Sequence, residues 1–269
     1  MVSLGVENIL LLWEEETPAD VRLPGISKYT GVAGIRKKIL EMMAETGTMP
    51  PFLDTEHSVQ ILGIYSPVHR CLQTTFSFVT GQVLARSHRV LYLNFENCSG
   101  LPQMLGRSFE SDFSELLYFL QEPWEALLAR ITRMAENING MDTLPPAGAG
   151  ADILKTPEKE WLRLLEVLQR SRYDYVILDL SDCIQGLFEI LRRCSRVYTI
   201  VREDAFAQAK LTQYEEQLAR MEFGDVLRKT KKCLLPVFSR LPRDLCHLAS
   251  GELAEYAERL LLEDEQRGV

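Results

Sequence analysis

The chain has 269 residues, of which 46% are hydrophobic and 25% charged, and its formal net charge is −8. These values predict a soluble globular protein with one sizeable core and a smaller appendage, and the negative charge argues against general affinity for DNA or anionic lipid. No apolar run approaches the roughly 18 residues of a membrane span, so a cytoplasmic location is predicted, and six scattered cysteines without a C-x-x-C pair indicate neither a zinc site nor a disulfide framework.

The first fifty residues are predicted to form a separate piece. A short apolar run at Asn8–Trp13 precedes an acidic triplet, and an amphipathic stretch follows at Gly31–Met43. One strand and one helix bury too little surface for a core of their own. Residues 1–50 therefore either dock on the main domain, residues 51–269, or are the remnant of a longer N-terminal domain plus a linker.

Short apolar runs then alternate with stretches of helical periodicity. The runs are almost entirely apolar, as expected for strands buried on both faces of a parallel sheet. The pattern predicts an α/β fold, with a predominantly parallel sheet and helices on both faces in three layers. The predicted strands are Val59–Tyr65, Arg89–Phe95, Tyr175–Leu180, Arg196–Val201 and Lys232–Phe238. The predicted helices are Thr74–Arg86, Phe113–Leu120, Trp124–Asn137, Glu158–Arg170, Ile184–Arg193, Ala205–Met221 and Glu252–Leu262.

Two further segments have a distinctive composition. Residues Asn139–Lys155 contain two prolines and three glycines, which predicts a surface loop. The C-terminal helix at Glu252–Leu262 is mainly acidic, and an acidic surface is repelled by anionic lipid, so direct membrane anchoring is not expected.

The segment Ile61–Phe76 reads ILGIYSPVHRCLQTTF and predicts a buried strand, a turn and a helix that opens with two threonines. Phosphate-binding loops lie at such junctions, because the amides at a helix N-terminus point outward and the helix dipole favours an anion. This turn is the first candidate for a functional site.

The segments around this turn resemble the bacterial MinD/ParA superfamily of deviant Walker P-loop ATPases, and most of all its CpaE/TadZ branch, which is associated with Flp-type pilus assembly and polar localisation. The resemblance implies a P-loop NTPase (SIMIBI-like) fold over about Ser58–Leu262, preceded by a receiver-like domain. Besides Ile61–Phe76 it rests on RVLYLNFENCSGL at Arg89–Leu101, YDYVILDLSD at Tyr173–Asp182 and RVYTIVREDAFAQAK at Arg196–Lys210, and for the receiver-like domain on Ile9–Glu16 and Ile26–Met43.

The phosphate loop departs from the family pattern. Counting back from Thr74, the Walker lysine falls on Gln73, and every family glycine and both lysines are replaced. Glycine permits the left-handed backbone that such a loop needs, and the lysine supplies a charge-assisted bond worth roughly 1.5–3 kcal/mol. Hydrolysis is therefore expected to fail, and tight ATP binding with it. The altered positions are Val68 for the signature lysine, Pro67, His69, Arg70 and Leu72 for glycines, and Cys71 and Gln73.

Other parts of the family site persist. Thr74 matches the magnesium-binding hydroxyl, Thr75 the second loop threonine and Asp179 the Walker B carboxylate, so Thr74 and Asp179 would hold magnesium if nucleotide binds. Asn94 stands where many relatives carry an acid, and Glu96 is its displaced equivalent. These two residues and Asp182 are the predicted switch-like positions.

Each of these residues also has a plain structural interpretation. Thr74 and Thr75 would cap the following helix, and Asp179 would end a strand and cap a turn with Ser181 and Asp182. His69 and Arg70 either replace the missing positive charge or are solvated in the turn.

Three functions remain open on the sequence. The first is an inactive, ATPase-like localisation or scaffold protein that binds partner proteins, a second copy of this chain among them, without nucleotide as the link. The second is a divergent ATP- and magnesium-binding switch of weak affinity, in which Arg70 or a residue from a partner chain supplies the missing charge. The third, a DNA-binding partition protein, rests on the family and on the basic run Arg228–Lys232, which is also explained as a helix end, and the net charge disfavours it.

Overall fold

A computed structural model describes residues 11–14, 25–30, 35, 38, 58–235 and 249–266, the last of these with side chains up to residue 264. In the N-terminal part, β1 (Leu11–Trp13) pairs in parallel with β2 (Gly25–Ser27). Ile35 and Lys38 are helical, and the remainder of the predicted stretch Gly31–Met43 lies outside the described residues. The division into domains therefore stays a prediction.

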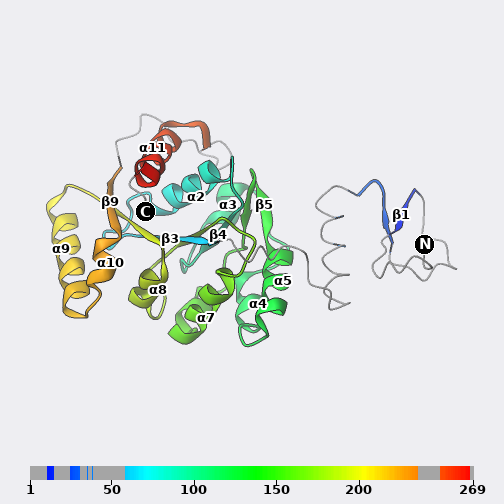
Figure 1. The fold of residues 1–269 in the computed structure, drawn as a ribbon, viewed down its shortest axis with the longest axis horizontal. Coiled ribbons are helices and arrows are strands. Elements are labelled where there is room, and N and C mark those ends of the chain that lie inside the picture. The colour runs from blue at the N-terminus through cyan, green and yellow to red at the C-terminus, as the bar shows by residue number, and fades with distance from the viewer. Residues whose placement is uncertain are drawn as a thin grey trace.

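The main sheet has seven strands in the order β5-β6-β4-β7-β3-β8-β9 (Figure 1). Every neighbouring pair is parallel except β5–β6, so the predicted parallel α/β fold is confirmed. All five predicted strands are present, although β9 begins two residues earlier than predicted, and residues 236–238 lie outside the described part of the chain. The strands are β3 (Gln60–Tyr65), β4 (Val90–Asn94), β5 (Glu136–Ile138), β6 (Met141–Thr143), β7 (Tyr175–Asp179), β8 (Arg196–Val201) and β9 (Thr230–Leu234).

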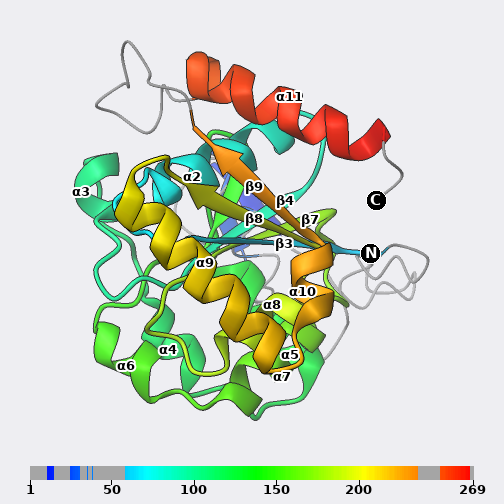
Figure 2. The same cartoon turned by 90° about the vertical axis from the view of Figure 1, so that its left-hand side faces the viewer.

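Helices cover both faces of this sheet (Figures 1 and 2). One face carries α2 (Gln73–Leu84), α3 (Leu101–Leu105) and α11 (Glu252–Gln266). The other carries α4 (Phe113–Leu117), α5 (Trp124–Met134), α6 (Gly150–Lys155), α7 (Glu158–Leu168), α8 (Leu187–Arg193), α9 (Ala205–Arg220) and α10 (Gly224–Arg228). None of the helices in the described residues is long and apolar enough to cross a membrane.

The central strand β3 is apolar after Gln60 because both of its faces are buried. Ile61 and Tyr65 belong to the core on the α9 face, whereas Leu62 and Ile64 belong to the core on the α2 face. A Cβ atom at Gly63 would lie 2.8 Å from Cys194 Sγ, so glycine lets this side chain pack directly against the strand. Burial on both faces fixes the register and thereby the position of the loop that follows β3.

The predicted surface loop at Asn139–Lys155 is wrong in part. Residues 141–146 are buried, and β6 and α6 lie within the segment. Asn139 and Gly140 both have positive φ, 51° and 90°, and connect β5 to β6 in an antiparallel hairpin. An Asn-Gly pair is a hairpin signal, and the glycine and proline content obscured it. The predicted helix at Trp124–Asn137 ends earlier, at Met134, because the first strand of the hairpin, β5, begins at Glu136.

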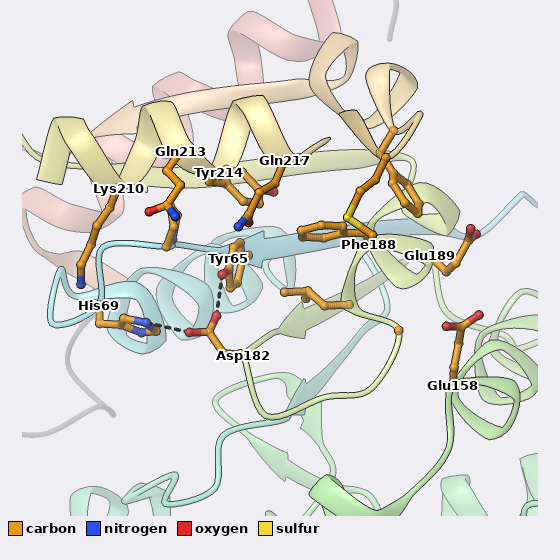
Figure 3. Close-up of a pocket in the computed structure, with 15 residues that line it drawn as sticks. Tyr65, His69, Glu158, Asp182, Phe188, Glu189, Lys210, Gln213, Tyr214 and Gln217 are labelled. Atoms are coloured by element: carbon orange, nitrogen blue, oxygen red, sulfur yellow. Dashed lines mark hydrogen bonds and ion pairs between the residues drawn. The ribbon is translucent and has the colours of Figure 1, made fainter. Parts of the chain in front are cut away.

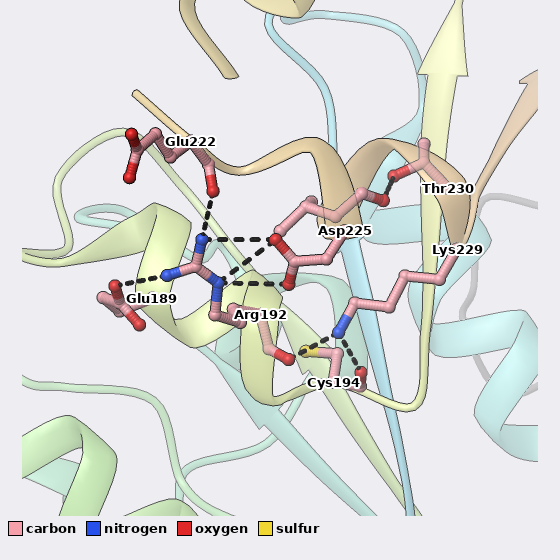
Figure 4. A network of polar contacts seen from close by, with 8 residues as sticks. Glu189, Arg192, Cys194, Glu222, Asp225, Lys229 and Thr230 are labelled. Carbon is pink, nitrogen blue, oxygen red and sulfur yellow. Dashed lines mark hydrogen bonds and ion pairs between the residues drawn. The ribbon is translucent and has the colours of Figure 1, made fainter. Parts of the chain in front are cut away.

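The basic run Arg228–Lys232 is mostly engaged within the protein. Lys229 Nζ donates to the carbonyl oxygen of Cys194 at 2.6 Å, beside Arg192, which bridges two acidic side chains (Figure 4). Lys231 contacts Glu263 and Asp264 at 3.0 Å, and Lys232 pairs with Glu215. The helix-end interpretation therefore holds for Arg228, the last residue of α10, and for Lys229, the C-cap of that helix, but not for Lys231 and Lys232, which lie in β9.

Candidate functional site

The sheet topology brings the predicted site residues to one edge. In a parallel sheet the carboxyl ends of the strands meet at the same edge, where ligands bind in open α/β folds. Strand β7 lies between β3 and β4, and Asp179 at its end is opposite both Ile64 and Asn94. The loop from Ser66 to Leu72, which links β3 to α2, lies beside these strand ends.

The backbone of this loop keeps left-handed conformations without glycine. The φ angles of His69, Arg70 and Leu72 are 61°, 47° and 64°. These are three positions at which the resembled family has glycine. A left-handed non-glycine residue costs about 1–2 kcal/mol, so the surrounding structure maintains a strained turn here. Val68 N–H donates to Ser66 Oγ at 3.1 Å, and the side chain of Cys71 is buried, and both features fix the path of the loop.

Gln73 is committed to the interior of the protein. Its Nε2 donates to Asp179 Oδ1 and to the carbonyl oxygen of Leu180, both at 2.7 Å. Two acceptors around one nitrogen fix the orientation of the amide group. The residue at the Walker lysine position therefore binds the end of β7.

Asp179 is enclosed by neutral hydrogen-bond donors. It has no exposed surface, and besides Gln73 it accepts from Tyr92 Oη and Asn94 Nδ2, each at 2.9 Å. No lysine or arginine of the described residues contributes to its environment, and burial raises the pKa of Asp179 to about 6. Asp179 ends β7 as expected, but it does not cap a turn with Ser181, whose hydroxyl donates to the carbonyl oxygen of Phe95.

A second carboxylate lies next to this group. Thr74 Oγ1 donates to Glu96 Oε1 at 3.1 Å, and the Glu96 N–H donates to Asn94 Oδ1 at 3.0 Å. Burial raises the pKa of Glu96, too. The predicted role of Glu96 as the acid beside Asn94 is consistent with this placement.

The capping interpretation of the two threonines is wrong. The N-cap of α2 is Leu72, in left-handed conformation and without a side-chain hydrogen bond. Thr74 contacts Glu96, and Thr75 is half-buried in the first turn. Neither hydroxyl therefore serves the helix end as a cap usually does.

Asp182 belongs to a different contact from Asp179. It accepts a hydrogen bond from Tyr65 Oη, and its Oδ2 lies 2.8 Å from His69 Nε2. These bonds join the loop after β3 to the loop after β7. Arg70 is exposed and makes no hydrogen bond or ion pair with any other described residue, so only His69 has found an acidic partner.

A cleft of about 640 Å³ adjoins this contact on the α9 face of the sheet (Figure 3). Tyr65, Phe188 and Tyr214 form an aromatic floor, with ring centroids 5.4 Å apart for Tyr65–Tyr214 and 6.0 Å for Phe188–Tyr214. The cleft, and Tyr92 as a partner of Asp179, were not predicted from the sequence. A tyrosine within an otherwise apolar buried strand was the available signal for Tyr92, because a buried hydroxyl needs a partner.

The residues as placed do not fit magnesium. Asp179 would have to exchange its donors for the ion, and magnesium requires near-octahedral oxygen ligands. The site therefore resembles a phosphate and metal site in which protein side chains occupy the hydrogen-bonding positions around Asp179.

The fold is similar to that of solved ParA-type ATPases. A ParA family ATPase from Chlorobium tepidum TLS matches with a TM-score of 0.54 at 16% identity, over 65% of this chain and 73% of that one. Apo McdA from Cyanothece matches with a TM-score of 0.52 at 16% identity, over 73% and 82% of the two chains. An ATP complex of a Cyanothece McdA variant matches with a TM-score of 0.51 at 15% identity, over 77% and 79%. At this identity the likeness establishes the fold, and no family model and no curated protein matches the sequence.

Proposed function

We propose that this chain is a catalytically inactive, ATPase-like localisation or scaffold protein that acts through contacts with other proteins. The observation that carries the proposal is the state of Asp179. The carboxylate that would hold magnesium is fully buried and accepts from Gln73, Tyr92 and Asn94. Gln73 stands at the lysine position, so the charge that would stabilise a transferring phosphoryl group is absent there.

The polar contacts of the site also hold its segments together without a ligand. Gln73 links α2 to β7, Thr74 links α2 to the end of β4, and His69 links the phosphate loop to the loop after β7. These bonds tie together the three segments that border the candidate site. A surface held in one arrangement by the protein itself suits a scaffold, whose partners need a constant shape.

The test is ATP turnover by the purified full chain with magnesium. Phosphate release at the level of a protein-free control is expected. Release above that level that disappears in Asp179→Ala would overturn the proposal. Because Asp179→Ala removes a buried carboxylate and is expected to lose stability, Thr74→Val serves as a second variant, and circular dichroism confirms that each variant is folded.

A weak ATP-binding switch is the second candidate, and one observation favours it. The loop retains left-handed residues at the glycine positions, and the N-terminus of α2 has no side-chain cap. Arg70 is exposed and unpaired among the described residues, so it is available to an anion. Binding predicts that ATP and magnesium at tenfold excess over the dissociation constant stabilise the fold by about 1.4 kcal/mol, or a few degrees in Tm. Arg70→Ala should abolish that shift and Arg107→Ala should leave it, whereas no shift at millimolar ATP ends this candidate.

The biological setting remains part of the proposal. A role in pilus assembly or polar localisation rests on the resemblance of the sequence to the CpaE/TadZ branch, and so does a homodimer as one assembly. A cytoplasmic location is the prediction made from the apolar pattern of the sequence. Binding of DNA finds no support, because three of the four cations in the run Arg228–Lys232 are engaged with protein groups.

A further inference from the structure

One face of α9 combines exposed apolar and polar side chains in a continuous stripe. Phe206, Lys210, Gln213, Gln217 and Met221 follow one another at intervals of four, three, four and four residues. Residues at this spacing lie on one side of a helix, and fifteen positions span about 22 Å. Phe206 is 84% exposed and Met221 57%, so both ends of the stripe present large apolar side chains. We call this set the α9 stripe.

All members of the α9 stripe except Phe206 line one wall of the 640 Å³ cleft, in which charge is separated between the two ends. Figure 3 shows Lys210 with His69 at one end and Glu158 with Glu189 at the other. Glu189 is paired with Arg192, but Glu158 has no hydrogen-bond or ion-pair partner among the described residues, and neither has Lys210. The cleft therefore offers one free cation and one free carboxylate to an occupant.

The acidic end of the cleft depends on one glycine. Gly186 has a φ of 74°, and a Cβ atom there would lie 2.2 Å from Glu158 Cγ. Any other residue would push the Glu158 side chain away from the loop that follows β7. Glycine at this position thus permits both the left-handed turn and the placement of Glu158 at the cleft.

We propose that the cleft and the α9 stripe form a docking site for one extended segment of a partner protein. The segment carries an acidic side chain toward Lys210 and a basic side chain toward Glu158, with apolar side chains against Phe206, Phe188 and Met221. This inference rests on the proposed role in protein contacts and adds the chemistry of the partner.

The length of the surface favours a protein segment as the occupant. A compound confined to the 640 Å³ cleft would leave Phe206, at the far end of the α9 stripe, exposed. A peptide that runs along the stripe covers both apolar ends and crosses the cleft between them. The side-chain amides of Gln213 and Gln217 make no hydrogen bond with other described residues, and they are free to pair with the backbone of such a peptide.

The experiment uses a phage library of random 16-residue peptides, selected on the purified full chain. Enriched peptides are expected to carry an acidic and a basic residue on either side of apolar residues. A synthetic peptide of the enriched sequence should bind Lys210→Glu about fivefold more weakly than the unaltered chain and Phe206→Ala about tenfold more weakly. Lys155→Glu makes the same charge change, and Tyr118→Ala removes a comparable exposed aromatic ring, both outside the cleft. Both variants should leave the affinity unchanged.

A charge exchange gives the sharpest outcome. The double variant Lys210→Glu with Glu158→Lys should prefer a peptide in which the acidic and basic residues are interchanged. Equal affinity of one peptide for both proteins, or a selection that enriches no charged peptide, overturns the docking site. Neither result bears on ATP turnover, and phosphate release would overturn the inactive state without affecting peptide binding, so the two proposals fail separately.

Discussion

The substitution Asp179→Asn tests how the centre of the candidate site is held. Asp179 is buried without a positive partner, and its carboxylate accepts from three neutral side chains. Asparagine has nearly the same shape and no charge. The exchange therefore removes the desolvation penalty of the ionised form. The side-chain oxygen of asparagine still accepts hydrogen bonds, whereas its NH2 group faces other donors.

The magnitude follows from the pKa. Burial raises the pKa of Asp179 from 3.8 to about 6, which corresponds to about 3 kcal/mol that ionisation takes from the stability of the folded protein. The folded state binds the proton more tightly than the unfolded state. This contribution to stability is therefore fully present below the unfolded pKa and is lost as the pH rises through about 6. Between pH 5 and pH 7 the loss is about 1.3 kcal/mol.

Urea denaturation followed by tryptophan fluorescence measures this effect in the full chain. We subtract the free energy of unfolding of the unaltered protein from that of Asp179→Asn. This difference should be about 1.3 kcal/mol larger at pH 7 than at pH 5, because only the unaltered protein loses stability over this range through residue 179. The difference between the two proteins cancels the titration of all other groups that the substitution leaves unchanged. Glu166→Gln, at an exposed position of α7, should give the same difference at both pH values.

Equal pH dependence in the two proteins would refute the reasoning. It would mean that Asp179 keeps an ordinary pKa in the folded state, which requires a nearby cation or access to water. Either condition would restore a carboxylate that is available to magnesium, and the proposal of an inactive site would lose its main support.

Three further predictions concern the loop and the C-terminal helix. Arg70→Gly should raise the free energy of unfolding by up to about 1 kcal/mol, because glycine adopts the left-handed conformation of this position without strain. As a control, Arg133→Gly within α5 should lower the free energy of unfolding by a similar amount. A lower denaturation midpoint for Arg70→Gly would contradict the strain at this position. Gln73→Lys should not create magnesium-dependent phosphate release, because the new ammonium group lies beside Asp179. Phosphate release above background would show that the lysine alone was missing. Asp264→Ala should destabilise the fold by about 3 kcal/mol in urea, because it leaves Lys231 partly unpaired, and an unchanged midpoint would mean that α11 is held by apolar contacts alone.

The strand pattern of the main domain was predictable because burial is a local property of sequence. A central parallel strand such as β3 contacts a core on both faces, so its residues after Gln60 are apolar without interruption. The errors lie at the sheet edge. Strands β5 and β6 have three residues each, and β6 carries the buried polar residue Asp142, which is bonded to Tyr173. A strand that is stabilised by a distant side chain leaves no periodic pattern in its own sequence.

The site shows a similar division. Its position was predictable, since the turn after β3 and the aspartate at the end of β7 are marked by sequence. The partner choices were not predictable, because Gln73, Tyr92 and Asn94 come from separate segments and converge only when β7 is inserted between β3 and β4. The ion pair of His69 with Asp182 depends on the same insertion.

By itself, the sequence determined which chemical groups are present: a phosphate loop with neither lysine nor glycine, a surviving aspartate, and strands apolar enough to form a parallel sheet. Only the tertiary structure decided what these groups do. It enclosed Asp179 among neutral donors and kept the loop left-handed without glycine. The physical reason is that a hydrogen bond or a buried charge depends on distances of a few ångströms between residues far apart in the chain, and folding alone sets those distances.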